Sequence, residues 1–288
     1  MAYIKKPGIC APLRQAGLVA LSISVTLVLS ACGGGGSEAN PDRAQPITQA
    51  ALTGLPQGYI SVEERSGKRV FDGWFSQGSS EELSALELWS EGAQRCSVVA
   101  DQPVATGAVV QVGSRWRNTL FAGDTIRVQS RSGDVVNLHA QRYDDAVVYA
   151  TAERWLSQAL PDDSQLVITG SDQFPAFGPV ALTPLTPLVA SAPVGGYSTD
   201  VKQPVVWEPS GDISDSIQLQ VLATSSDAGK ATDPVTCWLN DNGQFVLPDA
   251  VVQNLPENPQ LVYSLVRIRE QTHESEGAKL HISQISYP

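Results

Sequence analysis

Apolar and polar residues alternate in short runs along most of the chain after residue 55. Residues 58–75, GYISVEERSGKRVFDGWF, alternate on both sides of a Ser-Gly pair, which is typical of two strands joined by a tight turn. Val-rich runs such as TGAVVQVGS, DTIRVQSRSGDVVNLHAQRY and AVVYATAERW follow, with Gly or Asp between them. Short strands that recur every 8–12 residues or so predict an antiparallel sandwich or barrel.

Three turns are expected to connect hairpins: Ser132-Gly133-Asp134, Tyr143-Asp144-Asp145 and Asp241-Asn242-Gly243. The last is the strongest signal, because Asn and Gly tolerate the positive φ that a tight hairpin turn needs. The stretch SSEELSALELW permits two interpretations. Ser80 can cap a short helix, whereas the alternation of Leu86 and Leu88 fits a strand.

A proline-rich stretch at residues 174–193 divides the chain. Its five prolines predict a sheet edge or a semi-rigid connector, since proline cannot donate to a strand ladder. We place a domain boundary near residues 182–187, which gives an N-terminal β domain at 55–183 and a C-terminal β domain at 184–288. The predicted fold class is mainly β, with two antiparallel β-sandwich-like domains.

The C-terminal segment contains five strand-like runs over about 100 residues, with Trp207 on an early run and Tyr263 on a late one. In this pattern it resembles an immunoglobulin-like or fibronectin type III sandwich. The resemblance is one of pattern and strand count, and it implies no activity.

The N-terminus has three parts. Lys5, Lys6 and Arg14 precede an apolar run at residues 16–29, which is the order of a secretory signal. The run closes with Leu29-Ser30-Ala31-Cys32, which resembles the lipobox of bacterial lipoproteins. The resemblance implies diacylglyceryl transfer to Cys32, cleavage after Ala31 and acylation of the new amino group. The alternative is an ordinary secreted protein in which Cys32 is incidental.

Residues 32–54 then read as the lipidated cysteine and a flexible tether, since residues 33–51 contain four glycines and two prolines without a hydrophobic period. Such a string spans roughly 25 Å. Gly33 stands where an Asp argues for retention at the inner membrane in enterobacterial lipoproteins. The resemblance therefore favours the outer membrane, facing the periplasm or the surface, and the periplasmic face of the inner membrane is the alternative.

Charge narrows the range of partners. Processing removes three basic residues and no acidic one, so 16 Lys and Arg stand against 30 Asp and Glu, a net charge of −14. Such a surface repels nucleic acid. The expected partners are the membrane, through the lipid on Cys32, and an envelope protein or glycan.

Two cysteines remain after processing, Cys96 and Cys237, in an oxidising compartment. They can form a disulfide between the two halves of the chain. Each also has an inward-looking parity in a strand-like run, where a lone cysteine is often a small buried hydrophobe. Both alternatives remain open.

Motifs for catalysis are missing from the sequence. It contains no GxSxG, HExxH, P-loop or dinucleotide fingerprint, and its three histidines are His139, His273 and His281. The paired carboxylates Asp144-Asp145, Asp162-Asp163 and Asp212/Asp215 fall in turns, where side chains usually bond to their own backbone. We therefore assign no catalytic residue, metal or cofactor and expect a non-enzymatic protein. Calcium in one of these loops, and a glycan or ester hydrolase with an unidentified carboxylate site, are the alternatives.

Two tryptophans are candidates for ligand contact. Trp116 has arginines on both sides, and Trp238 has the opposite parity to Cys237, so it should point outward if Cys237 points inward. An exposed Trp can stack on a sugar or anchor a protein contact.

Overall fold

The computed structural model describes residues 54–77, 86–98, 119–143, 146–157, 159–191, 193–225 and 232–288. All of them lie in one compact unit, Gln49–Pro288. The signal peptide, Cys32 and the tether up to residue 53 lie outside the described residues.

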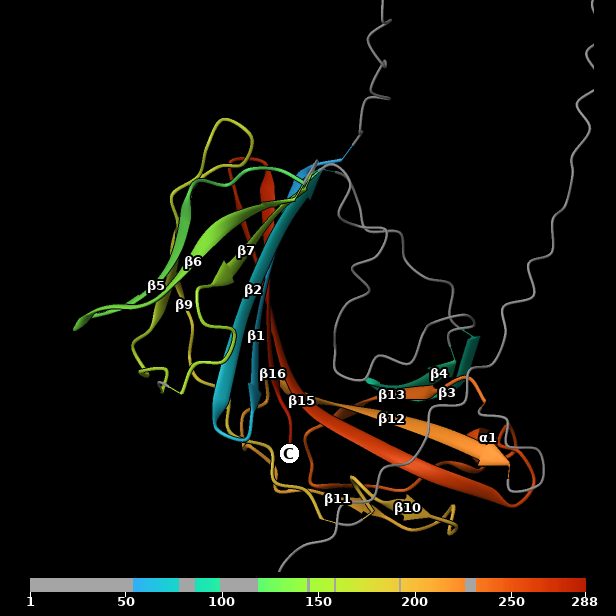
Figure 1. The fold of residues 1–288 in the computed structure, drawn as a ribbon. Helices are drawn as coiled ribbons and strands as arrows, with labels where there is room; N and C mark the ends of the chain where they lie inside the picture. Colours follow the sequence, from blue (N-terminus) through green and yellow to red (C-terminus); the bar gives the residue numbers. More distant parts are fainter. Residues whose placement is uncertain are drawn as a thin grey trace, which may run out of the picture. The chain divides into compact units, whose positions relative to one another are not determined.

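Strands dominate this unit, and most of them belong to one 14-stranded sheet (Figure 1). The order in the sheet is β3-β4-β13-β12-β15-β16-β1-β2-β7-β6-β5-β8-β9, with β10 paired to β15, and β11 and β14 form a separate pair. The strands are β1 Pro56–Arg65, β2 Lys68–Gln77, β3 Leu86–Glu91, β4 Gln94–Val98, β5 Thr125–Ser130, β6 Gly133–Tyr143, β7 Ala146–Thr151, β8 Gln165–Ile168, β9 Phe177–Ala181, β10 Tyr197–Ser198, β11 Val205–Val206, β12 Asp215–Ser225, β13 Val235–Asn240, β14 Gln244–Phe245, β15 Pro259–Ser275 and β16 Ala278–Ser286. The helix α1 is a single turn, Asp249–Val252.

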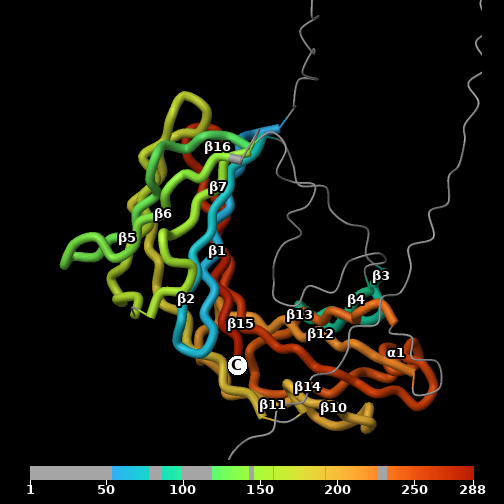
Figure 2. The backbone as a smooth tube through the Cα atoms, viewed as in Figure 1, coloured from blue at the N-terminus to red at the C-terminus, as the bar shows by residue number. Residues whose placement is uncertain are grey.

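The prediction of a mainly β chain is confirmed, but the sheet is mixed. β1 pairs with β16 in parallel, from Gln57 opposite Lys279 to Glu64 opposite Ser286. The first and last described strands are therefore neighbours (Figure 2). Local alternation predicts a strand but not its partner, so this pairing has no signature in the sequence.

Three predicted connections agree with the structure. β1 and β2 form a hairpin around Ser66 and Gly67, which both have positive φ, as a two-residue hairpin turn requires. β5 pairs with β6 across the turn at Ser132-Gly133, and β6 pairs with β7 up to Tyr143 opposite Ala146.

The hairpin predicted at Asp241-Asn242-Gly243 is wrong in its second strand. The chain turns there, but β14 pairs with β11 and not with β13. Trp207 N–H donates to the carbonyl of Gly243 at 2.9 Å, and Phe245 lies in the core beside Trp89. The apolar run after the turn therefore joins a second layer, in which Phe245 and Leu247 are buried.

Of the two interpretations of SSEELSALELW, the described part, Leu86–Glu91, is a strand, and residues 78–85 lie outside the described residues. The proline-rich stretch contains β9, which ends the order of the sheet, so the predicted edge is present.

The described residues form two large hydrophobic cores. The first core is built from β1, β2 and β5–β9 together with Ala278, Leu280 and Ile282 of β16. The second core contains Trp207, Tyr263 and the inward side chains of β12 and β13, together with Cys96 of β4. The hairpin β3–β4 thus belongs with residues beyond 184, and β16 belongs with residues before 183, because each completes the sheet beside a strand distant in sequence.

Candidate functional site

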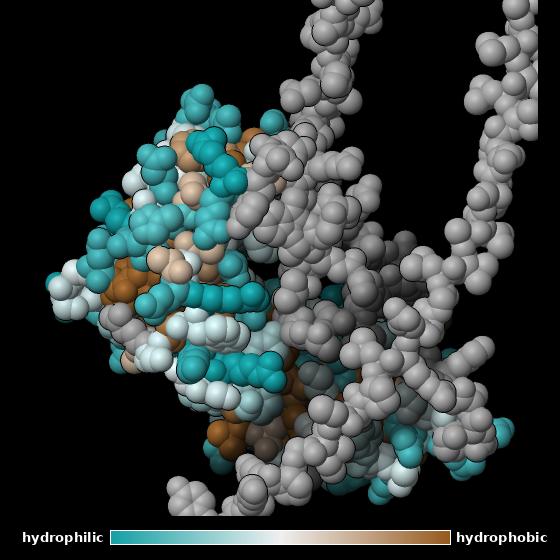
Figure 3. Space-filling view, in the orientation of Figure 1, coloured by the Kyte–Doolittle hydropathy of each residue, from teal (hydrophilic) through white to brown (hydrophobic). Residues whose placement is uncertain are grey.

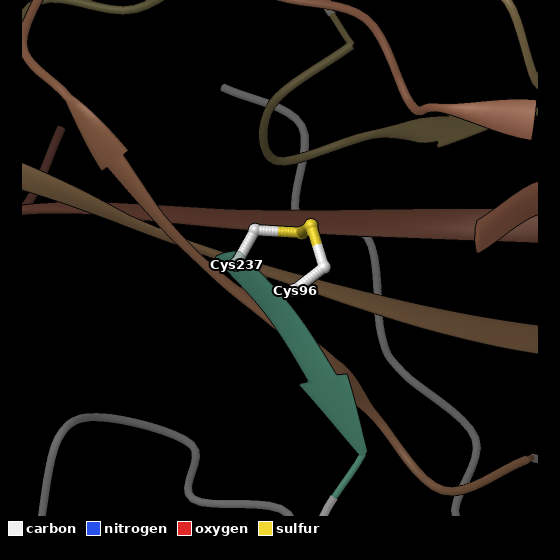
Figure 4. Close-up of a disulfide and its surroundings, with 2 residues drawn as sticks. All are labelled: Cys96 and Cys237. Carbon is white, nitrogen blue, oxygen red and sulfur yellow. A yellow bond between two sulfur atoms is a disulfide. The ribbon is translucent and has the colours of Figure 1, made fainter. Parts of the chain in front are cut away.

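A disulfide joins Cys96 of β4 to Cys237 of β13 (Figure 4). The two residues are direct register partners in the antiparallel pair, and both are fully buried in the second core. Of the two alternatives for these cysteines, the structure contains the bridge. It ties the β3–β4 hairpin to a strand 141 residues away in sequence.

Two buried arginines of β15 lie beside the second core. Arg267 is fully buried, and its Nε donates to Asp241 Oδ2 at 2.8 Å. Its Nη1 donates to the carbonyls of Thr186 and Pro187 at 3.0 and 2.9 Å, and its Nη2 donates to the carbonyl of Glu208. Arg267 therefore fastens the proline-rich connector and the segment after β11 to the sheet.

Arg269 does the same for the loop before β12. It bonds to Asp215 and Asp212 at 2.7 Å each and to the carbonyl of Thr183 at 3.4 Å. Hydrogen bonds from Ser214 and the charge of Arg269 hold the pKa of Asp212 below its usual range. The carboxylates of Asp212 and Asp215, interpreted from the sequence as turn residues, are thus partners of an arginine 54 or more residues away. The guanidinium groups of Arg267 and Arg269 therefore hold the surrounding loops against the sheet.

The opposite side of the sheet carries a row of stacked rings. Tyr59 of β1 lies between Trp74 of β2 and His281 of β16, with ring centroids 5.2 and 4.9 Å apart and planes within 11° and 17°. The three residues are register partners, and each is half-buried. Thr272 Oγ1 lies 3.1 Å from His281 Nδ1 on the next strand.

Two carboxylates stand on the same side of β1 and β2. Glu63 lies opposite Val70 and Asp72 opposite Ser61, so the two acids are diagonal neighbours. Burial and then the charge of Asp72 raise the pKa of Glu63, and Arg154 opposes this. Burial also raises the pKa of Asp72, even though part of its side chain remains exposed, and Arg154 again opposes the shift. We name these five residues, Tyr59, Glu63, Asp72, Trp74 and His281, the ladder face.

The ladder face combines aromatic edges with carboxyl groups that are easier to protonate than usual. Such groups can donate and accept hydrogen bonds with hydroxyls, and the half-buried rings beside them offer an apolar contact surface. Burial lowers the pKa of His281, and Lys279 acts in the same direction against Glu270. This set has no signature in the sequence, because Glu63, Asp72 and the rings come from three strands and no motif joins them.

Apart from the two disulfide cysteines, the predicted site residues fall in two places. Cys32 and Trp116 lie outside the described residues. Trp238 points away from the second core, as its parity predicts, and is half-buried against Val266, Ile268 and Ile285. It lies on the side of the sheet that carries the ladder face.

The remaining sequence candidates are scattered. His139 is exposed on β6, and Asp163 accepts a hydrogen bond from the backbone of Arg131. Among the residues described, no group of three or more His, Cys, Asp or Glu is placed to hold a metal ion. Within the same ranges, no helix has the length and apolar character to cross a bilayer. Most of the coloured surface in Figure 3 is hydrophilic, in keeping with the acidic composition.

In comparisons with known proteins, no family model matches the chain, and neither a curated protein nor a solved structure matches it.

Proposed function

We propose that this protein is a lipid-anchored lipoprotein of the bacterial outer membrane and acts without catalysis, as a binding or structural module of the cell envelope. The observation that carries the proposal is the lipobox-like Leu29-Ser30-Ala31-Cys32 behind a basic and then apolar N-terminus. A diacylglyceryl group with a further acyl chain gives stable anchoring, whereas one chain alone gives only marginal binding.

The folded part of the chain supports an envelope location. A buried disulfide between strands distant in sequence suits an oxidising compartment outside the cytoplasm. On this proposal, residues 32–54 tether the body, and the two cores are two sandwich-like modules, the second immunoglobulin-like in pattern. The second core's Trp207 and Tyr263 are both buried, in keeping with that pattern.

The anchor is tested by changing one residue, Cys32→Ser. We expect the wild-type protein to sediment with the outer membrane and to carry acyl mass on its N-terminal peptide. The variant should leave the membrane fraction. Unchanged membrane retention without acyl mass would overturn the proposal.

The ladder face is the surface we propose for binding an envelope glycan or protein. Its specific chemistry also favours a second candidate, a glycan or ester hydrolase, because Glu63 and Asp72 are neighbouring carboxyls with raised pKa values. Glycosidases use two carboxyls across the scissile bond. A screen of generic glycoside and ester substrates distinguishes the two. If the wild-type protein turns over a substrate and Glu63→Gln abolishes this turnover, the protein is a hydrolase. A binding module is expected to turn over no substrate.

A further inference from the structure

A second surface of the molecule is built from three short extended runs. Residues 189–191 pair with the segment after β11, with Ala190 opposite Trp207 and Glu208 N–H donating to the carbonyl of Val189 at 2.9 Å. On the other side of this segment, β11 pairs with β14 through Val205 and Phe245. The three runs therefore form a small layer over the second core.

The inner side of this layer is apolar, and its outer side carries both apolar and polar residues. Its inward side chains lie in the second core and are buried: Leu188, Val205, Trp207, Phe245 and Leu247. Its outward side chains include Val189, Val206 and Val246, which are 51%, 37% and 45% exposed. A layer with one face on a core and one toward water normally alternates apolar and polar residues. The outward polar residues are Ser191, Glu208 and Gln244, and the three exposed valines stand among them without contributing to the core. We name these three valines the valine face.

The layer beneath the valine face is held rigidly. Trp207 Nε1 donates to Asp241 Oδ1 at 2.7 Å, and Asp241 is itself paired with the buried Arg267. Arg267 also bonds to the carbonyl of Glu208 in the middle run. A surface fixed in this way loses little conformational entropy when another molecule binds.

Acidic groups accompany the valines. Glu208 is exposed and follows Val206 on the same side of its run, and Asp249, three residues after Val246, has a side chain that is 80% exposed. Lys202 pairs with Asp249 and so offsets one of these charges. The charge around the valine face therefore matches a cationic partner, and it disfavours anionic lipid and a second copy of the same face.

We propose that the valine face is a docking surface for an extended protein segment with apolar side chains on one side and Lys or Arg at its margins. The proposal goes beyond the proposed function, because the valine face is a different surface from the ladder face. It does not depend on the lipid anchor, so the two can fail separately.

The test uses the full chain with Cys32→Ser in every sample, so that lipid does not contribute. The probe is a synthetic peptide of alternating Val and Lys, compared with a peptide of equal length in which Glu replaces Lys. The two key variants are Val206→Asp on the valine face and Gln165→Asp at an exposed position of β8, which adds the same charge elsewhere. Binding is followed by titration calorimetry.

We expect the Val-Lys peptide to bind and the Val-Glu peptide not to bind. Val206→Asp should weaken the binding at least tenfold although it makes the protein more acidic, whereas Gln165→Asp should leave it unchanged or slightly tighter. Val206→Thr keeps the side-chain shape and should give an intermediate loss with an unchanged thermal midpoint, which separates docking from misfolding.

Three results overturn the proposal. The first is binding of the Val-Lys peptide that Val206→Asp leaves unchanged or strengthens, because this indicates charge attraction alone. The second is that the protein does not bind the peptide but instead binds zwitterionic vesicles, or self-associates in sedimentation, and that Val206→Asp abolishes this. The third is no peptide binding to any sample. A change in membrane fractionation of Cys32→Ser bears only on the anchor.

Discussion

At the scale of single residues, Arg267 is the largest fully buried side chain among the described residues. Its guanidinium is fully buried and is paired with Asp241, whose side chain is 2% exposed. A buried ion pair adds little net stability, but breaking it leaves an uncompensated charge in a medium of low dielectric constant. The pair therefore matters for keeping one arrangement of the connector and the loops around it.

Replacing this arginine should destabilise the protein strongly. We expect Arg267→Ala to lower the free energy of unfolding by about 3–5 kcal/mol, since Asp241 loses its cationic partner and three carbonyls lose a donor. Urea unfolding measures the loss. Arg131→Ala is the matched control, because Arg131 forms an ion pair with Asp163 while remaining 93% exposed, and such surface pairs contribute about 0–1 kcal/mol. Equal effects of the two variants would contradict the structural role of Arg267.

The same pair predicts a pH dependence. Burial raises the pKa of Asp241, but hydrogen bonds from Ser210, Arg267 and Trp207 lower it by more. The pKa of Asp241 in the folded protein is therefore below the usual 3.8. A lowered folded-state pKa means that the stabilisation is present above the ordinary Asp pKa and is lost as the pH falls through the lower value. The urea concentration at the midpoint of unfolding should therefore decrease as the pH is lowered from about 5 to about 2.

Asp241→Asn provides the control for this pH dependence. The variant should be less stable at pH 7 and should lose less stability on acidification, because the amide does not titrate. A slope equal to that of the wild type would assign the acid sensitivity to other carboxylates.

At the scale of elements, the disulfide decides how the β3–β4 hairpin is attached. The hairpin lies at the end of the sheet order and pairs with β13 alone among the described strands outside itself. Removing the bridge with Cys96→Ala and Cys237→Ala together should lower the free energy of unfolding by about 2–5 kcal/mol, as for a native disulfide that closes a long loop. Guanidinium unfolding of the double variant measures this. A loss under 1 kcal/mol or so would show that pairing and packing alone hold the hairpin.

Parity along a strand explains what the sequence could predict of these elements. The alternation around Cys237 correctly placed Cys237 inward and Trp238 outward, and the Ser66-Gly67 pair correctly placed a hairpin. The same parity also predicts buried arginines in β15, where Arg267 and Arg269 continue the inward series of Tyr263 and Leu265. A charged residue at an inward position indicates a buried ion pair, but its partners lie too far away in sequence to be named.

The alternation of apolar and polar residues does not show which strands pair with each other. Gln244 and Phe245 read as the second strand of a hairpin, yet they pair with β11, because a buried position for Phe245 outweighs local turn chemistry. The ladder face could not be predicted for the same reason, since its rings come together only when β1 pairs with both β2 and β16.

At the scale of the whole molecule, the first core depends on residues near both ends of the described chain. Leu280 of β16 is fully buried among residues of β1, β2 and β5–β9. We expect Leu280→Ala to lower the free energy of unfolding by about 2–5 kcal/mol, measured by urea unfolding.

A matched control for that prediction is Val189→Ala, which removes a side chain that is half exposed on the valine face. It should change stability by no more than about 0.5 kcal/mol. If Leu280→Ala were equally mild, the contribution of β16 to the first core would be in doubt.

The parallel pairing of β1 with β16 has a consequence for the timing of folding. Any process that delivers the chain from its N-terminus, whether synthesis on a ribosome or passage through a translocation pore, releases β1 long before β16. Throughout that interval β1 has an unsatisfied edge and the first core lacks Leu280 and Ile282. The sheet can close only when more than 200 further residues have emerged. Pairing of that open edge with another chain is therefore the hazard that this topology carries during delivery.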